Sequence, residues 1–346
     1  MATRQNPTMA PLSLSPALTA TGTYPFVKLE AAKRRLAAQG VELIDFGKGD
    51  PREPTDPMIR QALVESITEI STYPLAEGLP ELRSAVAGWC SRRFGVELDP
   101  DIEIVPTYGS KEAIFLLAQI LIDRDGDRRL VVTTQPGYPV PDRGAAFAGA
   151  DVLQLPLLEG NGFLPDLDAV GAATWRQAAI VWINYPNNPT GAVAPLDFLE
   201  RLASMTGYRS GFVAASPDLI AALKQFRPSV GTAPQEFVQR ASVVAWSEDE
   251  HVERTRTAYR RKRDALLPTL ARKGIRVAGS EATMFLWLEV PGGEQSDAFA
   301  TRLLERGLIV SPGTFFGAAG EGYWRLALVP TETECRRAAE ILEDVL

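Results

Sequence analysis

The stretch from Ala178 to Gly191 contains side chains suited to binding a small polar molecule. Its first six residues are apolar and predict a buried strand, and the following eight, NYPNNPTG, predict a turn. Proline fixes its own φ angle, so the two prolines would hold the amide side chains between them before a ligand arrives. In open α/β sheets, ligands bind at the carboxyl ends of the strands. An amide in this turn is therefore a candidate ligand-binding group.

A second candidate site lies where a predicted strand, 102–105, is followed by a predicted helix that runs through Ile122. The loop between them ends in Gly109-Ser110-Lys111. The first N–H groups of a helix have no partner inside the helix, and together with the helix dipole they favour an anion such as a phosphate. Gly-Ser before a helix is a weak signal by itself, and Lys111 is also compatible with an ordinary solvated lysine.

Two further side chains have types suited to a flat ring and to a carboxylate. Tyr138 follows the predicted strand 129–134, and an aromatic ring in that place can stack on a planar ligand. Arg325 lies on a predicted strand, and its planar fork can bind a carboxylate through two parallel hydrogen bonds. A single arginine on a strand usually faces solvent, so its assignment needs further support.

The elements that would position these residues predict an α/β fold. Strands and helices alternate from 102 to 191, which indicates a mostly parallel sheet flanked by helices. Ser247 and Glu250 predict a capping box at the start of a long helix, and short strands and two helices after it predict a smaller α+β domain. We expect these parts: a flexible arm at 1–23, part of the small domain at 24–50, a large domain at 51–250, and a linking helix with the rest of the small domain at 251–346.

Composition excludes several classes of function. The chain has 346 residues, a net charge of −7 and no basic stripe, which argues against a nucleic-acid surface. Cys90 and Cys335 form no CxxC pair, and the single histidine, His251, makes a multi-histidine metal site or a Ser-His-Asp triad improbable. No apolar stretch is long enough to span a membrane, and residues 1–23 lack the features of a signal peptide. We expect a cytoplasmic protein with no metal.

The motifs together resemble one enzyme family. Residues 185–191 read YPNNPTG, which resembles the family motif NPNNPTG. The sequence also contains GDP at 49–51 and the pattern Y-x-x-x-x-G-x-x-x-L-R at 73–83. With these three motifs the chain is similar to the class I/II aminotransferases. These are pyridoxal 5′-phosphate (PLP) enzymes of fold type I, and the chain looks most like their succinyldiaminopimelate aminotransferase-related group. The resemblance implies a homodimer that transfers an amino group between an amino acid and a 2-oxo acid, in lysine and diaminopimelate synthesis.

The resemblance also implies roles for individual residues. Gly109, Ser110, Lys111 and Arg209 match positions at the cofactor phosphate, and Tyr73 matches a tyrosine that reaches the phosphate of the neighbouring subunit. Tyr138 matches the residue that covers the PLP ring, and Asn188 the amide that bonds its phenolic oxygen. Gly49, Asn188 and Arg325 match positions that bind the substrate carboxylate.

One part of the family pattern is absent. In the family a Schiff-base lysine, an aspartate and a tyrosine lie on two strands between the NPTG turn and the phosphate arginine. Here Gly191 and Arg209 are only 18 positions apart, and neither an Asp-Glu-x-Tyr nor a Ser-x-Ser-Lys string occurs. No catalytic lysine can therefore be assigned among the seven, which are Lys28, Lys33, Lys48, Lys111, Lys224, Lys262 and Lys273.

Three interpretations remain open. In the first, the natural protein is an aminotransferase with an internal segment that this sequence lacks. In the second, the chain is a true deletion variant that folds and binds a ligand without transaminating. In the third, the fold is kept but the reaction is another PLP reaction, such as β-elimination.

Overall fold

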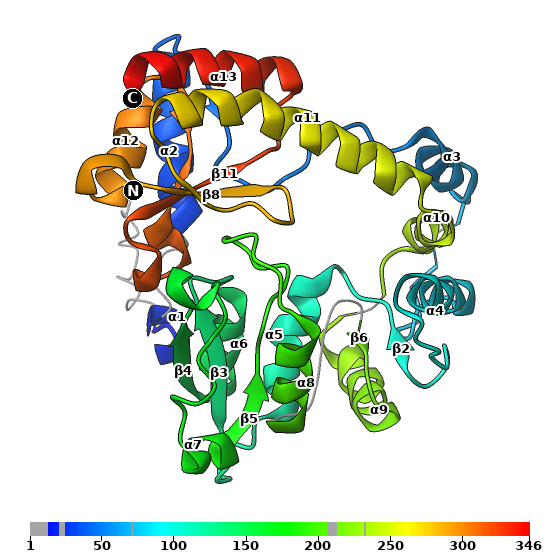
Figure 1. Cartoon of the computed structure of the whole chain (residues 1–346). Coiled ribbons are helices and arrows are strands. Elements are labelled where there is room, and N and C mark those ends of the chain that lie inside the picture. The colour runs from blue at the N-terminus through cyan, green and yellow to red at the C-terminus, as the bar shows by residue number, and fades with distance from the viewer. Residues whose placement is uncertain (1–12, 21–24, 71, 206–212, 232) are drawn as a thin grey trace, which may run out of the picture.

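The computed structural model describes residues 13–20, 25–70, 72–205, 213–231 and 233–346. They form two lobes (Figure 1): a large lobe of residues 57–247, and a small lobe of residues 25–46 together with 250–346. The long helix α11, Glu250–Arg272, belongs to the small lobe and extends toward α10, Glu236–Ser247, in the large lobe.

A parallel sheet of order β4-β3-β5 lies at the centre of the large lobe. The bounds are β3 Leu130–Gln135, β4 Asp151–Pro156 and β5 Ala178–Val181. Helices α5, Ser110–Leu121, and α6, Val140–Ala148, pack against it, and small residues such as Ala118 and Ala145 let them approach Val131 and Ile180 closely. The 3₁₀ turn η1 spans Glu159–Asn161, and α7 spans Ala172–Gln177.

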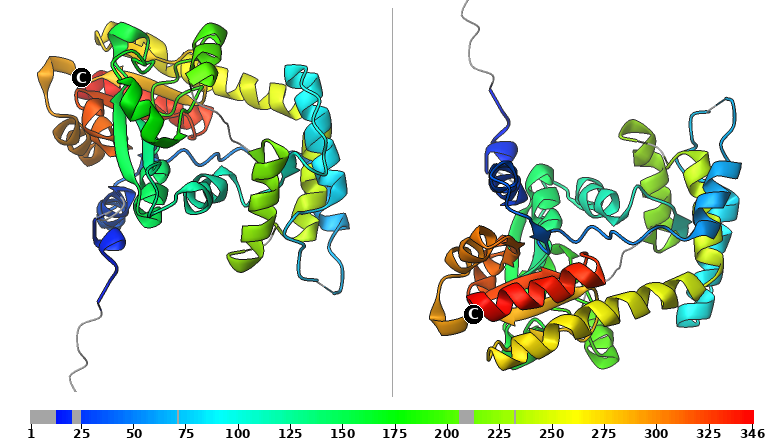
Figure 2. Two further views of the ribbon diagram at one scale, coloured as in Figure 1. Left: turned by 90° about the horizontal axis from the view of Figure 1, so that it is seen from below. Right: turned by 90° about the horizontal axis from the view of Figure 1, so that it is seen from above.

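A second, two-stranded sheet completes the large lobe. Strand β2, Ile104–Val105, pairs antiparallel with β6, Val213–Ala214. The surrounding helices are α3 Pro57–Glu65, α4 Pro80–Phe94, α8 Leu196–Met205, α9 Pro217–Phe226 with η2 Arg227–Ser229, and α10. Figure 2 shows α3, α4 and α10 together at one side of the molecule. Within the described residues, β5 and β6 are both edge strands and the two sheets share no strand.

The small lobe contains an antiparallel sheet of order β10-β11-β8-β7 and a parallel pair β1-β9. Its strands are β1 Ile44–Asp45, β7 Val277–Gly279, β8 Phe285–Glu289, β9 Leu308–Ile309, β10 Ser311–Pro312 and β11 Tyr323–Ala327. Its helices and 3₁₀ turns are α2 Pro25–Ala38, α11, α12 Ser296–Glu305, α13 Glu332–Val345, η3 Pro291–Gly293, η4 Gly313–Phe316 and η5 Ala318–Gly320. A short helix α1, Pro16–Ala20, precedes them.

The two faces of the β8-β11 ribbon have different partners. Successive residues of a strand point to opposite faces. Leu286 and Leu288 of β8, with Trp324 and Leu326 of β11, enter the main core formed with α11, α12 and α13. Trp287, which is directly opposite Arg325 in the register, belongs instead to a cluster that includes residues of the large lobe. One face of this ribbon therefore stabilises the small lobe, and the other face forms the junction between the lobes.

The α/β fold with a parallel sheet is confirmed, and the β2-β6 pair is the antiparallel exception within the large lobe. The predicted capping box is wrong, because Ser247 is the last residue of α10 and its hydroxyl donates to the carbonyl of Val243. Helix α11 begins at Glu250 after Asp249. Helix α1 lies inside the predicted arm, whose residues 1–12 and 21–23 are outside the described part.

Candidate active site at the junction of the lobes

The turn after β5 is organised by a buried amide. Asn187 is completely buried, and its Oδ1 accepts hydrogen bonds from the backbone N–H and the hydroxyl of Thr190, at 3.1 and 2.8 Å. Its backbone N–H donates to the carbonyl of Ala192 at 2.8 Å. The backbone N–H of Asn188 donates to Oδ1 of Asn184 at 3.0 Å. These bonds hold the turn closed and let the half-buried side chain of Asn188 contact another element.

Asn188 contacts Arg325 across the junction. The Nη1 of Arg325 donates to Oδ1 of Asn188 at 2.9 Å, and its Nη2 donates to the carbonyl of Gly47 at 2.7 Å. The hydroxyl of Ser311, fully buried on β10, also donates to that carbonyl at 2.7 Å. Segments far apart in the sequence therefore meet around one guanidinium, whose residue is only 3% exposed. Sequence reasoning missed Gly47 and Ser311, because nothing local in either residue indicates such a long-range partner.

Gly49 lies close to the side chains of Phe285 and Met284, where a larger residue would not fit without a shift. A Cβ atom at Gly49 would stand 3.1 Å from two ring atoms of Phe285 and 3.2 Å from the methyl of Met284. The absence of a side chain therefore lets the 47–49 backbone pass close to β8. The three predicted substrate-binding positions, Gly49, Asn188 and Arg325, thus lie in one neighbourhood.

The predicted phosphate loop forms the N-terminus of α5. Gly109 is the N-cap residue with φ +71°, Ser110 is the first helical residue, and Lys111 is exposed. Glu112 fixes this loop: its carboxylate accepts the N–H of Tyr108 at 2.5 Å and pairs with the buried Arg227, whose Nε lies 3.1 Å away. The helix N-terminus offers unpaired N–H groups to an anion.

Tyr138 lies in the loop between β3 and α6, and this loop is tied to the small lobe. The N–H of Gly137 donates to the carbonyl of Phe316 at 2.9 Å, and Oε1 of Gln135 accepts from the N–H of Ala319 at 3.3 Å. Partial burial raises the pKa of the Tyr138 hydroxyl, because the ionised form loses hydration. The ring is therefore neutral at physiological pH.

One predicted cofactor residue, Tyr73, is not brought to this place by the single chain, and another, Arg209, is not among the described residues. Tyr73 lies between α3 and α4 with 85% of its surface exposed. Arg209 lies outside the described residues, so its position stays a prediction.

Four of the lysine side chains that the structure describes form ion pairs. Lys33 and Lys48 both pair with Glu30, Lys224 pairs with Glu77, and Lys262 pairs with Glu53. Lys111 is at the start of α5 and Lys273 follows α11. The described residues also contain no group of three or more His, Cys, Asp or Glu suited to a metal ion.

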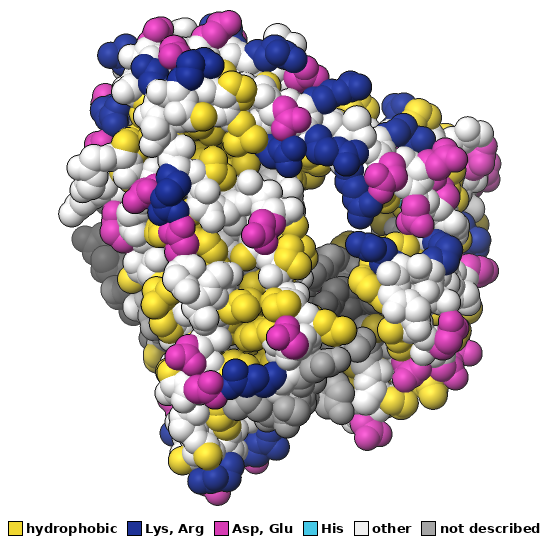
Figure 3. Space-filling view, viewed as in Figure 1, with side chains coloured by type: hydrophobic (Ala, Val, Ile, Leu, Met, Phe, Trp, Pro, Cys, Tyr) yellow, Lys and Arg dark blue, Asp and Glu magenta, His cyan; other side chains and the backbone are white. Residues whose placement is uncertain are grey.

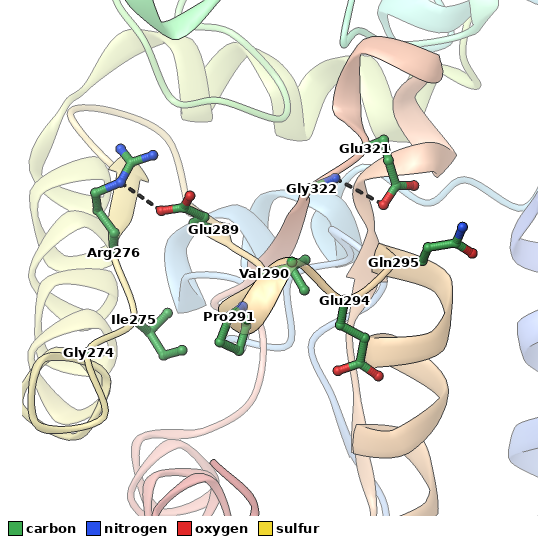
Figure 4. Close-up of a pocket in the computed structure, with 12 residues that line it drawn as sticks. Gly274, Ile275, Arg276, Glu289, Val290, Pro291, Glu294, Gln295, Glu321 and Gly322 are labelled. Atoms are coloured by element: carbon green, nitrogen blue, oxygen red, sulfur yellow. Dashed lines mark hydrogen bonds and ion pairs between the residues drawn. The ribbon is translucent and has the colours of Figure 1, made fainter.

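The surface gives two more features. Figure 3 shows an opening between α11 and the large lobe, with basic side chains along its α11 edge. A pocket of about 570 Å³ lies elsewhere, at the far end of β8 (Figure 4). Its charged side chains are already engaged, since Glu289 pairs with Arg276 at 2.8 Å and Glu294 with Arg302 at 2.9 Å. None of the predicted site residues lines it.

Comparison with known proteins decides the family. The family model described as "Aminotransferase class I and II" matches residues 41–206 and 203–342. The chain belongs to this aminotransferase family. Class I and II aminotransferases are PLP-dependent enzymes, so the predicted fold, enzyme class and cofactor are confirmed. The two matched stretches meet at 203–206, close to the position where the sequence lacks the expected segment.

Two relatives carry a more specific name. The LL-diaminopimelate aminotransferase of Nitratidesulfovibrio vulgaris strain DP4 is 35% identical over 374 residues, covering 92% of this chain and 96% of the relative. That of Dehalococcoides mccartyi strain CBDB1 is 36% identical over 363 residues, covering 89% of this chain and 93% of the relative. Both alignments are longer than the 346 residues of this chain, so each relative contains residues with no counterpart here.

Solved structures of aminotransferases share the fold. An aspartate aminotransferase double mutant from Thermus thermophilus has a TM-score of 0.87 at 28% identity, covering 97% of this chain and all of that one. A probable N-succinyldiaminopimelate aminotransferase from the same species has a TM-score of 0.83 at 28% identity, covering 93% of this chain and 100% of that one. Among the described residues, no helix is long and apolar enough to cross a membrane.

Proposed function

We propose that the junction of the lobes is an aminotransferase substrate site in which Arg325 binds the α-carboxylate of an amino acid and of a 2-oxo acid. The observation that carries this proposal is the convergence of Arg325, Asn188 and the Gly47–Gly49 backbone from three distant segments. A planar guanidinium beside an amide suits a carboxylate, which can accept two hydrogen bonds from one arginine. The names of the relatives favour a substrate of the diaminopimelate type, in lysine synthesis.

The described residues fit the PLP molecule in part. The N-terminus of α5 at Gly109 and Ser110 would hold the phosphate, with Lys111 beside it. Tyr138 would cover the ring, and Asn188 would donate to its phenolic oxygen. When bound, PLP supplies an electron sink for the substrate Cα. We place Arg209 and the partner's Tyr73 at the phosphate as the family pattern implies, in a cytoplasmic homodimer.

The fit fails at the covalent anchor, and we propose that this 346-residue chain lacks the Schiff-base lysine. The lysines with described side chains lie in other ion pairs or at helix ends, and the alignments to relatives leave residues unmatched. The edge strands β5 and β6 mark where further strands would fit. A ligand-binding protein without transaminase activity is therefore the second candidate function, and β-elimination is the third.

Borohydride reduction tests the anchor directly. The chain is saturated with PLP, reduced, digested and analysed by mass spectrometry. We expect PLP to bind reversibly and no lysine-containing peptide to gain a pyridoxyl group. Labelling of one lysine would disprove the proposed absence.

Titration with 2-oxoglutarate and with LL-diaminopimelate tests the carboxylate site, which should bind both in the presence of PLP. Ammonia release from a β-substituted amino acid would favour the third candidate.

A further inference from the structure

The guanidinium of Arg325 lies over two aromatic rings. Its central carbon is 4.4 Å from the centroid of the Phe285 ring and 4.6 Å from that of Phe316. All three side chains are buried, with exposures of 3, 8 and 5% for Arg325, Phe285 and Phe316. An aromatic face carries negative charge density and attracts a cation, most strongly where water is excluded.

The ring of Phe285 is fixed by the sheet and by Gly49. In the β8-β11 register, Phe285 is opposite Ala327, and Arg325 is opposite Trp287, so Phe285 and Arg325 point to the same face. Gly49 lies beside the ring, because a Cβ there would stand 3.1 Å from two of its atoms. A side chain at position 49 would press on the ring, so the position of the Phe285 ring depends on this glycine.

Phe316 is held from both lobes, by a backbone hydrogen bond from the large lobe and by a ring contact within the small lobe. Phe316 ends η4, and its carbonyl accepts the N–H of Gly137 from the loop that carries Tyr138. Its ring packs edge-on against Trp287, with centroids 5.9 Å apart and planes at 81°. Phe316 therefore connects Arg325 to the loop that we place over the cofactor ring.

We propose that Phe285 and Phe316 are positioning residues for the substrate carboxylate, and that they act by clamping the guanidinium of Arg325 between their faces. The clamp restricts rotation of the Arg325 side chain. Hydrogen bonds from Nη2 to the carbonyl of Gly47 and from Nη1 to Oδ1 of Asn188 hold the orientation of the fork. A pre-oriented fork loses less entropy when a carboxylate binds, so the clamp raises affinity without touching the ligand. This inference rests on the proposed role of Arg325 in substrate binding.

Fluorinated phenylalanine tests the clamp without changing side-chain packing. Phe285 or Phe316 is replaced by phenylalanines with an increasing number of ring fluorines. These retain the shape of the ring and remove the negative charge density of the ring face. We expect the Kd of 2-oxoglutarate, measured by calorimetry with PLP present, to rise stepwise, by roughly two- to thirtyfold at full fluorination. Phe299 is the matched control, because its ring faces Arg302, whose guanidinium carbon is 5.1 Å from its centroid.

Three further variants separate the possible failures. F316L should raise the Kd of 2-oxoglutarate, and F299L is its control for loss of stability, measured as the melting temperature. G49A should also raise the Kd, because the added Cβ would push the Phe285 ring. R325K tests the underlying site. If R325K binds weakly but fluorination at 285 and 316 has no effect, the clamp is disproved and the carboxylate site stands. If R325K binds like the wild type, or the wild type does not bind, the proposed site and the clamp both fail.

Discussion

At the scale of single residues, Arg325 and lysine are not interchangeable, although both are cations. Arg325 donates through Nη1 to Asn188, and through Nη2 to Gly47 and to the hydroxyl of Ser311. A lysine would keep the charge and lose the planar fork. In an active relative with arginine at the aligned position, replacement by lysine should raise KM about 10- to 100-fold for the amino acid and the 2-oxo acid alike, as expected for loss of a charged hydrogen bond. Steady-state kinetics in both directions would show it, and an unchanged KM for the 2-oxo acid would contradict the assignment.

The two adjacent asparagines should have separable roles. Asn187 is fully buried and accepts two hydrogen bonds from Thr190, so N187A leaves buried donors unpaired. We expect the free energy of unfolding to fall by about 1–3 kcal/mol. Asn188 is half-buried and contacts Arg325, so N188A should weaken 2-oxo acid binding with a smaller effect on stability. Urea unfolding and calorimetry on both variants provide the comparison, and equal losses of stability would argue against this division.

At the scale of elements, the ion pair of Lys262 and Glu53 joins α11 to the segment after Gly49 and to the end of β11. Lys262 is buried, and its Nζ also donates to the carbonyl of Leu328 at 3.1 Å. Burial would raise the pKa of Glu53, but hydrogen bonds, chiefly from Lys262 and also from Tyr259, outweigh it and lower the pKa below its usual value.

This lowered pKa predicts the sign of a pH effect. A carboxylate with a lowered pKa in the folded state stabilises the fold above its unfolded pKa, and this contribution disappears as the pH falls through the folded pKa. The free energy of unfolding should therefore decrease below about pH 4.5, and more steeply in the wild type than in E53Q. Denaturant unfolding at several acidic pH values measures both slopes. Parallel slopes would show that Glu53 is not responsible.

The elements themselves were largely predictable where hydrophobic periodicity is strong. Strand β3 starts and ends one residue later than the predicted strand 129–134, and helix α5 ends one residue before the predicted Ile122. Helix α7 was missed because its six residues are too few to show a helical period. The capping box was misplaced because Ser247 can also donate back to the preceding turn, as its bond to Val243 shows. Local sequence does not distinguish these alternatives.

At the scale of the whole molecule, the substrate site could be predicted only through long motifs. The NYPNNPTG run and the Arg325 strand each suggest binding, but their convergence depends on how the lobes meet. Gly47, Ser311 and the two phenylalanines at Arg325 have no local signature. Their roles follow from the β8-β11 register and from contacts such as that of Gly137 with Phe316.

The exposure of Tyr73 bears on assembly. A tyrosine with 85% of its surface in water contributes little to the stability of the folded monomer. We expect it to be covered in a homodimer, where it reaches the phosphate site of the partner. Measurement of mass in dilute solution with and without PLP tests this, and Y73F should weaken PLP binding several-fold without changing the melting temperature of the apo chain. A monomer that binds PLP tightly would remove Tyr73 from the site.

The strongest expectation at this scale is that the 346-residue chain does not transaminate. We expect none of the seven lysines to replace the family's Schiff-base lysine in moving a proton at the substrate Cα, because general-base catalysis requires a group within hydrogen-bond reach. The edge strands β5 and β6 also leave backbone groups without ladder partners among the described residues. Each such group costs about 1–3 kcal/mol if buried, against the roughly 5–15 kcal/mol that usually holds a domain folded. We therefore expect a low yield of folded protein.

Conversion of PLP to pyridoxamine phosphate with excess amino acid measures this activity, with free PLP as the baseline and an LL-diaminopimelate aminotransferase as the positive control. The chain should remain at the baseline, and K111M should change nothing, although Lys111 is the lysine nearest the predicted phosphate loop. Turnover well above free PLP would contradict the prediction. Loss of that turnover in K111M, with PLP binding retained, would then identify Lys111 as the residue that had replaced the missing lysine.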